Sequence, residues 1–286
     1  MLIEVKELKF TYMPGTPFAV DAVNNLSLKI EEGEFLGVIG RTGCGKSTLI
    51  QLMAGLIKPD YGAVLLNGED INGEKYDRRI LRKNVGVVFQ YPEYQLFEET
   101  VGKDVAFGLQ KLGLTESEVL KKVDRALSLV GFTPDDVRNV SPFDLSGGQK
   151  RKVAIAGVLV IGPNILMLDE PIAGLDPAAR ESFMELILKL NAGGVTIIMI
   201  SHNMDGLSDY ASRIVAMDCG EIAIDGTAKQ VFANMERLMR LGLGAGAART
   251  AAFMLKQRGW DIPDDIIAID ELVDCIAQQL KSGSSA

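Results

Sequence analysis

The segment Gly40–Ser47, with the sequence GRTGCGKS, constrains this chain more than any other. It fits the phosphate-binding pattern Gly-x-x-x-x-Gly-Lys-Ser/Thr. Apolar residues 35–39 before it predict a buried strand, and residues 48–53 after it predict a helix. In this order, glycine N–H groups and a helix N-terminus surround one point, which suits phosphate oxygens. We therefore expect a nucleotide site here.

The residue types of this phosphate loop predict individual roles. Lys46 is expected to reach the β- and γ-phosphates, and the Ser47 hydroxyl to bind Mg²⁺. Cys44 lies at a helix N-terminus beside Lys46, an environment that lowers a thiol pKa and predicts reactivity; the alternative is a buried, inert cysteine. The residues expected to contact the nucleotide are Gly40, Arg41, Thr42, Gly43, Cys44, Gly45, Lys46, Ser47 and Thr48.

Composition limits the remaining possibilities. The 286 residues, 47% of them hydrophobic, allow one large α/β domain and a small additional piece. The formal net charge of −8 argues against a nucleic-acid partner, which requires a basic surface. Three unevenly spaced cysteines suit a reducing compartment, and no apolar run approaches the ~20 residues of a membrane span. With no signal-peptide pattern, we expect a cytoplasmic protein that reaches membranes through partners.

Polar side chains follow apolar segments that are typical of buried parallel strands. In open α/β sheets, ligands bind where such strands end. Residues 165–168 precede Asp169 and Glu170, so Asp169 is expected to bind Mg²⁺ and Glu170 to polarise an attacking water. Gln90 follows residues 85–89 and is predicted to touch Mg²⁺ or that water; the alternative is a solvated loop residue.

His202 and Tyr12 have two interpretations each. His202, the one histidine of the chain, follows apolar residues 195–200, where its imidazole could bond the γ-phosphate or form structural hydrogen bonds. Tyr12 ends a predicted strand over residues 2–12 and could stack on adenine or be a half-buried strand residue. We favour the functional interpretation for His202 and leave both open for Tyr12.

A second glycine-rich helix start lies at residues 145–149, with the sequence LSGGQ. Ser146 is a good N-cap, while Gly147 and Gly148 leave backbone N–H groups open at the helix N-terminus. A cap alone explains Ser146 but not the paired glycines, so this segment is expected to face a phosphate held by another molecule. Residues 91–145 lack strand signals and predict a helical insertion in the α/β domain.

The composition changes after residue 228, and residues 242–248 are rich in glycine and alanine, which predicts a linker or loop. Beyond it, apolar residues at helical spacing form a C-terminal stripe: Ile269, Leu272, Val273, Ile276 and Leu280. The stripe is predicted to associate with a second subunit; the alternative is packing on its own domain.

The motifs together resemble those of the ATP-binding-cassette (ABC) ATPases. They are, in order, GRTGCGKS, Gln90, LSGGQ, ILMLDE, the GLD at 174–176 and His202. The resemblance covers residues 1–230 and implies an α/β P-loop NTPase fold with a parallel-sheet core, an antiparallel β part and a helical subdomain over 91–160. Residues 231–286 would form a small helical extension for dimerisation. ATP and Mg²⁺ would be the ligands, held in a sandwich of two subunits.

The resemblance also implies residue roles. Tyr12 would stack on adenine, and Asp176 would lie in a loop that crosses the dimer. The catalytic residues would be Glu170 as general base, His202 at the γ-phosphate, the sensing Gln90, and Lys46, with Ser47, Gln90 and Asp169 at the metal. The signature residues, which would contact ATP bound by the opposite subunit, are Ser146, Gly147, Gly148 and Gln149.

Finer features resemble one branch, the energy-coupling-factor (ECF) transporter ATPases, and in particular the second of their two paralogous types. They are residues 12–18, 90–101, 141–144 and 269–273. The implied partners are a second ATPase subunit (paralogue or self), a transmembrane coupling protein and a membrane substrate-binding protein, at the cytoplasmic face of the membrane. The substrates of that family are vitamins or transition-metal ions. Ala173 departs from the general pattern, in which many members carry serine, and lacks the hydroxyl that could form a hydrogen bond across the dimer.

Two other functions share part of this pattern. The ATPase of another importer, including a cobalt or nickel type that works as a homodimer, would carry nearly every motif. A non-transport ABC protein acting on DNA or ribosomes would have a long coiled-coil insertion, or two cassettes with a charged linker. The chain has neither pattern, and its acidic charge also argues against that class.

Residues 91–107 lie between Gln90 and the signature, so their movement can report whether a γ-phosphate is bound. They contain Glu93, Glu98, Glu99 and Asp104 among the aromatic residues Tyr91, Tyr94 and Phe97. This composition predicts an acidic, aromatic surface for an arginine-bearing helix of the membrane partner; the alternative is a solvated acidic face.

Overall fold

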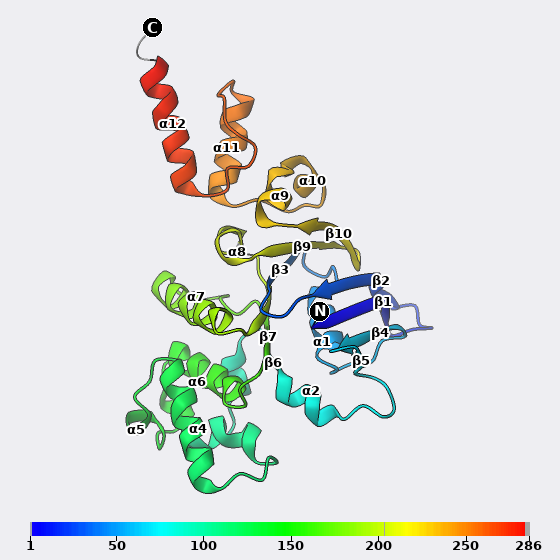
Figure 1. The fold of residues 1–286 in the computed structure, drawn as a ribbon, viewed down its shortest axis with the longest axis vertical. Coiled ribbons are helices and arrows are strands. Elements are labelled where there is room, and N and C mark those ends of the chain that lie inside the picture. Colours follow the sequence, from blue (N-terminus) through cyan, green and yellow to red (C-terminus); the bar gives the residue numbers. More distant parts are fainter. Residues whose placement is uncertain (1, 203, 284–286) are drawn as a thin grey trace.

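The computed structural model describes residues 2–202 and 204–283, which form two β-sheets with packed helices (Figure 1). The larger sheet has the order β10-β9-β3-β8-β7-β6, and β10 pairs antiparallel while the other strands pair in parallel. Its strands are β3 (Phe35–Gly40), β6 (Val85–Val88), β7 (Ile165–Asp169), β8 (Thr196–Ile200), β9 (Arg213–Asp218) and β10 (Glu221–Gly226). This is the predicted parallel-sheet core.

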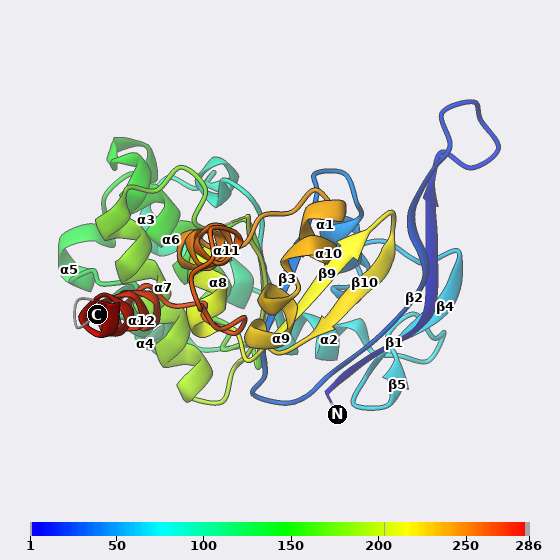
Figure 2. The same cartoon turned by 90° about the horizontal axis from the view of Figure 1, so that it is seen from above.

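The smaller sheet is antiparallel, with the order β2-β1-β4-β5. Its strands are β1 (Ile3–Tyr12), β2 (Val20–Ile30), β4 (Tyr61–Leu66) and β5 (Glu69–Asp70). Figure 2 shows this sheet and the helical region on opposite sides of the larger sheet.

Side chains of the larger sheet alternate between two hydrophobic clusters. Leu36 and Val38 of β3 pack with α1 (Lys46–Met53), α2 (Arg78–Asn84) and the smaller sheet, whereas Phe35 and Ile39 pack on the other face. Continuous apolar strands are typical of parallel sheets that are covered on both faces. The phosphate loop therefore follows a strand that is buried on both sides.

Helices cover the second face of the larger sheet. They include α7 (Pro177–Ala192), α8 (Met204–Tyr210) and, in residues 91–160, α3 (Val101–Ala106), α4 (Glu116–Leu129), α5 (Pro134–Val137) and α6 (Gly147–Leu159). Short 3-10 helices lie at Pro92–Gln95, Phe107–Leu109 and Pro142–Asp144. Buried Val105, Leu127 and Val153 belong to the same cluster as Phe35, so this helical region shares the core of the sheet.

The C-terminal part continues from the sheet edge. α9 (Ala228–Ala233) packs on β10 and is followed by α10 (Met235–Arg240). α11 (Ala247–Gln257) and α12 (Ile269–Gly283) extend away from the sheets (Figure 1) and pack on each other around Ala252, Ile262 and Leu272. Within the described residues, none of the helices combines the length and the apolar character needed to cross a membrane.

Four parallel strands end at the same edge of the larger sheet. β3 leads into the phosphate loop, β6 is followed by Gln90, β7 ends at Asp169, and β8 is followed by His202. Because the carboxyl ends of parallel strands share an edge, these segments meet there.

Candidate nucleotide site

The phosphate loop joins β3 to α1. Gly45 has a left-handed backbone (φ 104°), and a Cβ at this position would lie 2.0 Å from the carbonyl oxygen of Ala22, so the position requires glycine. Lys46 is buried, and its Nζ donates to the carbonyl oxygens of Gly40 at 2.7 Å and Arg41 at 2.9 Å. The ammonium group therefore lies inside the curve of the loop.

One cavity of about 530 Å³ brings the loop together with the ends of β6, β7 and β8. Among its lining are the predicted residues Thr42, Gly43, Lys46, Ser47, Gln90, Asp169, Glu170 and His202. The hydroxyl of Ser47, the amide of Gln90 and the buried carboxylate of Asp169 provide oxygen donors here. Oxygen donors are the ligands that Mg²⁺ prefers, so these residues fit that ion.

Glu170 and His202 face each other in this cavity. Nε2 of His202 lies 3.3 Å from Oε1 of Glu170, and the backbone N–H of His202 donates to Oε2 at 3.4 Å. Burial raises the pKa of Glu170 above its ordinary value, although the neighbouring His202 partly lowers it. A carboxylate with a raised pKa beside an imidazole suits proton transfer.

Tyr12 lies beside α1 and outside the lining of this cavity. Its hydroxyl is 3.3 Å from Oγ1 of Thr48, and its ring contacts Phe10 edge to face, with the ring centroids 4.9 Å apart. The residue is 40% exposed. It is therefore an exposed strand tyrosine next to the phosphate loop.

The signature residues and Asp176 lie at exposed helix starts. Ser146 Oγ accepts from the N–H of Gln149 at 3.4 Å, and the Gln149 side chain accepts from the N–H of Ser146 at 3.0 Å. This capping box starts α6 at Gly147. Asp176 accepts from the N–H of Ala179 at 2.9 Å and caps α7. The exposed residues are Ser146, Gly147, Gly148, Gln149 and Asp176.

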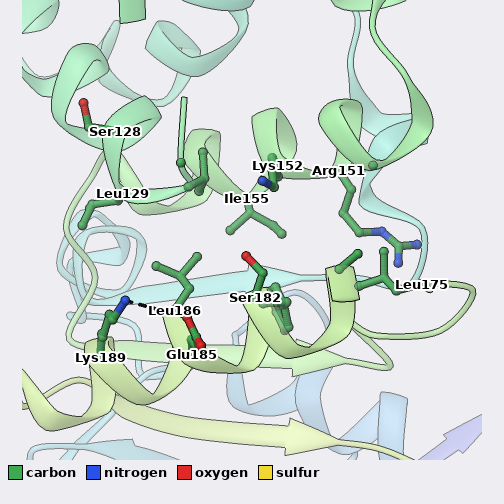
Figure 3. A pocket seen from close by; sticks show the side chains of 15 residues that line it. Ser128, Leu129, Arg151, Lys152, Ile155, Leu175, Ser182, Glu185, Leu186 and Lys189 are labelled. Atoms are coloured by element: carbon green, nitrogen blue, oxygen red, sulfur yellow. Dashed lines mark ion pairs between the residues drawn. The ribbon is translucent and has the colours of Figure 1, made fainter. Parts of the chain in front are cut away.

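A second cavity, of about 320 Å³, separates the helical region from α7 (Figure 3). Gly148 lines this cavity, and Figure 3 shows Arg151 and Leu175 at one end of it and Lys189 beside Glu185 at the other. Among the described residues, no signature residue lines the cavity that contains Lys46. The two halves of the expected ATP site therefore do not meet within one chain.

The prediction that Cys44 has a lowered pKa is wrong. Cys44 is 7% exposed, and burial raises the pKa of its thiol more than the neighbouring Lys46 lowers it. Its Sγ fills the space beside Gly40, where an added Cβ would lie 2.5 Å away. The thiol is therefore buried, as the alternative interpretation expected.

The expected acidic surface over residues 91–107 is smaller than predicted. Glu93 is only partly exposed, because Arg151 pairs with its carboxylate at 2.9 Å. Asp104 accepts from the backbone N–H groups of Phe97 and Glu98, at 2.9 and 3.0 Å. Glu99 is exposed and pairs with Lys103. The exposed aromatic residues are Tyr91, Tyr94, Phe97 and Phe107.

The sequence interpretation missed several residues around the site. Arg180 and Ser201 line the cavity of Lys46. Arg180 lies one helical turn after Asp176, and Ser201 directly precedes His202. This proximity to motif residues was the sequence feature that could have identified them as site residues. The glycine-rich residues 242–246 lie across a third cavity, of about 610 Å³, from Gly40, Arg41, Thr42 and His202.

Known proteins with similar sequences show which family the chain resembles. The ABC transporter family matches residues 23–173. The "Energy-coupling factor transporter ATP-binding protein EcfA2" of Acetivibrio thermocellus is 46% identical over 98% of this chain and 99% of its own, and that of Symbiobacterium thermophilum is 47% identical over 96% of each.

Solved structures are similar as well. The structure of cbiO1 from Clostridium perfringens, "Part of the ABC transporter complex cbiONQ", has a TM-score of 0.72 and 37% identity, covering 84% of this chain and 94% of that one. A dimeric ATP-binding cassette in a post-hydrolysis state, bound to ADP and Pi, has a TM-score of 0.70 and 29% identity, covering 79% and 99%.

Proposed function

Because the chain belongs to the ABC transporter family, and within it to the ATP-binding proteins of energy-coupling-factor transporters, we propose that it hydrolyses ATP between two subunits to drive uptake. It is the ATP-hydrolysing subunit of an ECF-type importer. The observation that carries the proposal is the single cavity in which the phosphate loop meets Gln90, Asp169, Glu170 and His202.

The separation of the signature from this cavity supports a two-subunit site. Gly147 and Gly148 lie at an exposed helix start, and among the described residues no side chain comes within 4 Å of a Cβ added at either position. A nucleotide bound at Lys46 would be completed by the signature of a second subunit. We propose a paralogous ATPase as that second subunit, with a second copy as the alternative.

The chemistry would be divided among residues of the cavity. The phosphate loop and Lys46 would hold the phosphates, Glu170 would accept a proton from the attacking water, and His202 would donate to the γ-phosphate. Ser47, Gln90 and Asp169 would hold Mg²⁺, which neutralises phosphate charge when bound. Tyr12 would stack on adenine.

The remaining partners belong to the membrane. We propose that the chain binds at the cytoplasmic face to a transmembrane coupling protein, together with a membrane protein that binds a vitamin or a transition-metal ion. The exposed Tyr94, Phe97 and Phe107 support docking in the segment after Gln90, because a partner helix would bury them. Asp176, which caps α7 at the surface, would contact the second ATPase subunit.

Replacement of Glu170 tests the function. Glu170→Gln should lower ATP hydrolysis by about 10²-fold or more while ATP still binds, because the phosphate loop is unchanged and the general base is lost. Steady-state hydrolysis is measured with the sites of the partner ATPase disabled, and binding is measured with a fluorescent ATP analogue. Glu185→Gln, which removes a mostly exposed carboxylate on α7, is the control. Near-normal hydrolysis by Glu170→Gln would rule out this role.

A further inference from the structure

The side chain of Arg151 joins segments that are far apart in the sequence. It projects from α6, just after the signature, and is 4% exposed. Its Nε and Nη2 donate to the two carboxylate oxygens of Glu93, at 2.9 and 3.0 Å. Its Nη1 donates to the carbonyl oxygens of Ala173 at 2.8 Å and Pro171 at 3.4 Å. One guanidinium group therefore holds two different segments against α6.

Both segments adjoin residues of the proposed mechanism. Glu93 lies three residues after Gln90, in the segment that follows β6. Pro171 follows Glu170 directly, and the N–H of Ala173 donates to the carbonyl oxygen of Glu170 at 3.2 Å. A shift of the guanidinium would therefore be transmitted to the backbone on either side of the cavity.

The same contacts support two unusual backbone conformations. Tyr91 (φ 54°) and Glu170 (φ 51°) are left-handed, which residues with a Cβ rarely adopt unless their surroundings hold them. Cζ of Arg151 lies 5.9 Å from the centroid of the Tyr91 ring, over its face. The cavity beside Arg151 (Figure 3) leaves this part of α6 without close packing on α7. The polar contacts of Arg151 therefore link α6 to the segment after Glu170.

We propose that Arg151 is a positioning residue that makes the signature helix, the segment after Gln90 and the segment after Glu170 move as one unit when ATP binds. The inference rests on the function proposed above. Arginine suits this role, because its planar fork pairs with both oxygens of Glu93 and still has a third nitrogen for the carbonyl groups. Lysine carries the same charge but cannot make this set of bonds.

The test separates ATP affinity from the rate of hydrolysis in the full-length chain within its assembled transporter. Arg151→Lys should lower kcat by about ten- to a hundredfold, because misplacing reacting groups by about 1 Å has such an effect. ATP affinity should stay within about twofold, since the phosphate loop is unchanged. The double variant Arg151→Lys/Glu93→Gln should be no slower than the more severe single variant, because the two residues act as one unit.

Arg138→Gln is the matched control. It breaks another ion pair of the helical region, between Arg138 and Asp124 at 3.0 Å, and should leave kcat near the wild-type value. Three results would overturn the inference: wild-type kcat in Arg151→Lys, equal losses of ATP affinity and kcat, or additive effects in the double variant. If Arg151→Lys does not fold, kcat and ATP affinity of the single variant Glu93→Gln decide whether the inference holds. This variant keeps the bonds of Arg151 to the carbonyl groups.

Glu170→Gln is measured in parallel to separate the inference from the proposed function. Slow hydrolysis by Glu170→Gln together with wild-type kcat in the variants of Arg151 and Glu93 would overturn the inference alone. Wild-type hydrolysis by Glu170→Gln would instead overturn the proposed function.

Discussion

Glu170 combines several features that disfavour folding. Its carboxylate is 14% exposed, its backbone is left-handed (φ 51°), and Asp169 precedes it. Burial raises the pKa of the Glu170 carboxyl, and the negative charge of Asp169 adds to this effect. Strain and unfavourable charge of this kind are expected where a residue serves function at the expense of stability.

We predict that Glu170→Gln increases the free energy of unfolding at neutral pH. A carboxyl whose pKa is raised in the folded state favours the protonated form there. The resulting stabilisation is fully present below the ordinary glutamate pKa and is lost as the pH rises through the raised pKa. At about pH 7 the wild-type chain therefore holds a poorly solvated charge, which glutamine avoids.

Chemical denaturation of the nucleotide-free chain at about pH 7 and about pH 4 checks this prediction. The stability advantage of Glu170→Gln over the wild type should be present at the higher pH and shrink at the lower one. Glu185→Gln, which removes a carboxylate that is 62% exposed, should show no such pH dependence. An equal difference between variant and wild type at both pH values would contradict the explanation.

At the scale of elements, a buried arginine anchors α11 to the body of the domain. Arg249 is 2% exposed, and its Nε and Nη2 donate to the carbonyl oxygens of Phe232 and Ala233, each at 3.1 Å. These are carbonyl groups at the end of α9, which have no partner within their own helix. A cation at a helix C-terminus also interacts favourably with the helix dipole.

Arg249→Ala should loosen this attachment. We expect the free energy of unfolding to fall by about 3 kcal/mol, because a buried and a partly buried carbonyl group lose their donors and a large buried side chain is removed. Limited proteolysis should produce earlier cleavage within residues 247–283. Arg258→Ala removes an exposed arginine at the end of the same helix and serves as the control. Identical stability and cleavage patterns in the two variants would show that Arg249 is not the anchor.

At the scale of the whole molecule, the C-terminal stripe divides into two parts. Leu272 is buried and Ile276 packs in the small cluster between α11 and α12. Ile269, Val273 and Leu280 are exposed by 61%, 55% and 56%. Packing on its own extension therefore accounts for two of the five stripe residues, and the other three are exposed, where we predict contact with a second ATPase subunit.

We predict that replacing Ile269, Val273 and Leu280 together by lysine weakens association of the nucleotide-free ATPase subunits by about tenfold or more. The reason is that the loss of about 1.4 kcal/mol of apolar contact free energy raises the dissociation constant by that factor. Truncation after Gly246 should have the same effect. Sedimentation of the subunits measures the association. A control carries lysine at three other exposed positions, Ile80, Leu112 and Leu120. Unchanged association in the triple variant would show that the stripe packs only within its own chain.

The parts of the site that consist of contiguous residues could be predicted from the sequence. The phosphate loop was recognisable because its glycines, Lys46 and Ser47 must follow one another between a strand and a helix. Gln90, Asp169 and His202 were predictable because each lies at or just after the end of an apolar strand, and parallel strands bring their ends to one edge. The parallel-sheet core and the helical insertion of residues 91–145 follow from the same local patterns, whereas the wider bounds 91–160 were implied by the resemblance to ABC ATPases.

Which predicted side chains are exposed and which are buried or paired became clear from the folded structure. Glu93 was predicted to be exposed, yet Arg151, 58 residues away, takes up both of its carboxylate oxygens. Cys44 was predicted to be acidic from its neighbours in sequence, but burial disfavours the thiolate more strongly. Such outcomes depend on desolvation and on partners that the fold brings from distant segments. Motif spacing does not contain this information, because it records neighbours along the chain and not neighbours in space.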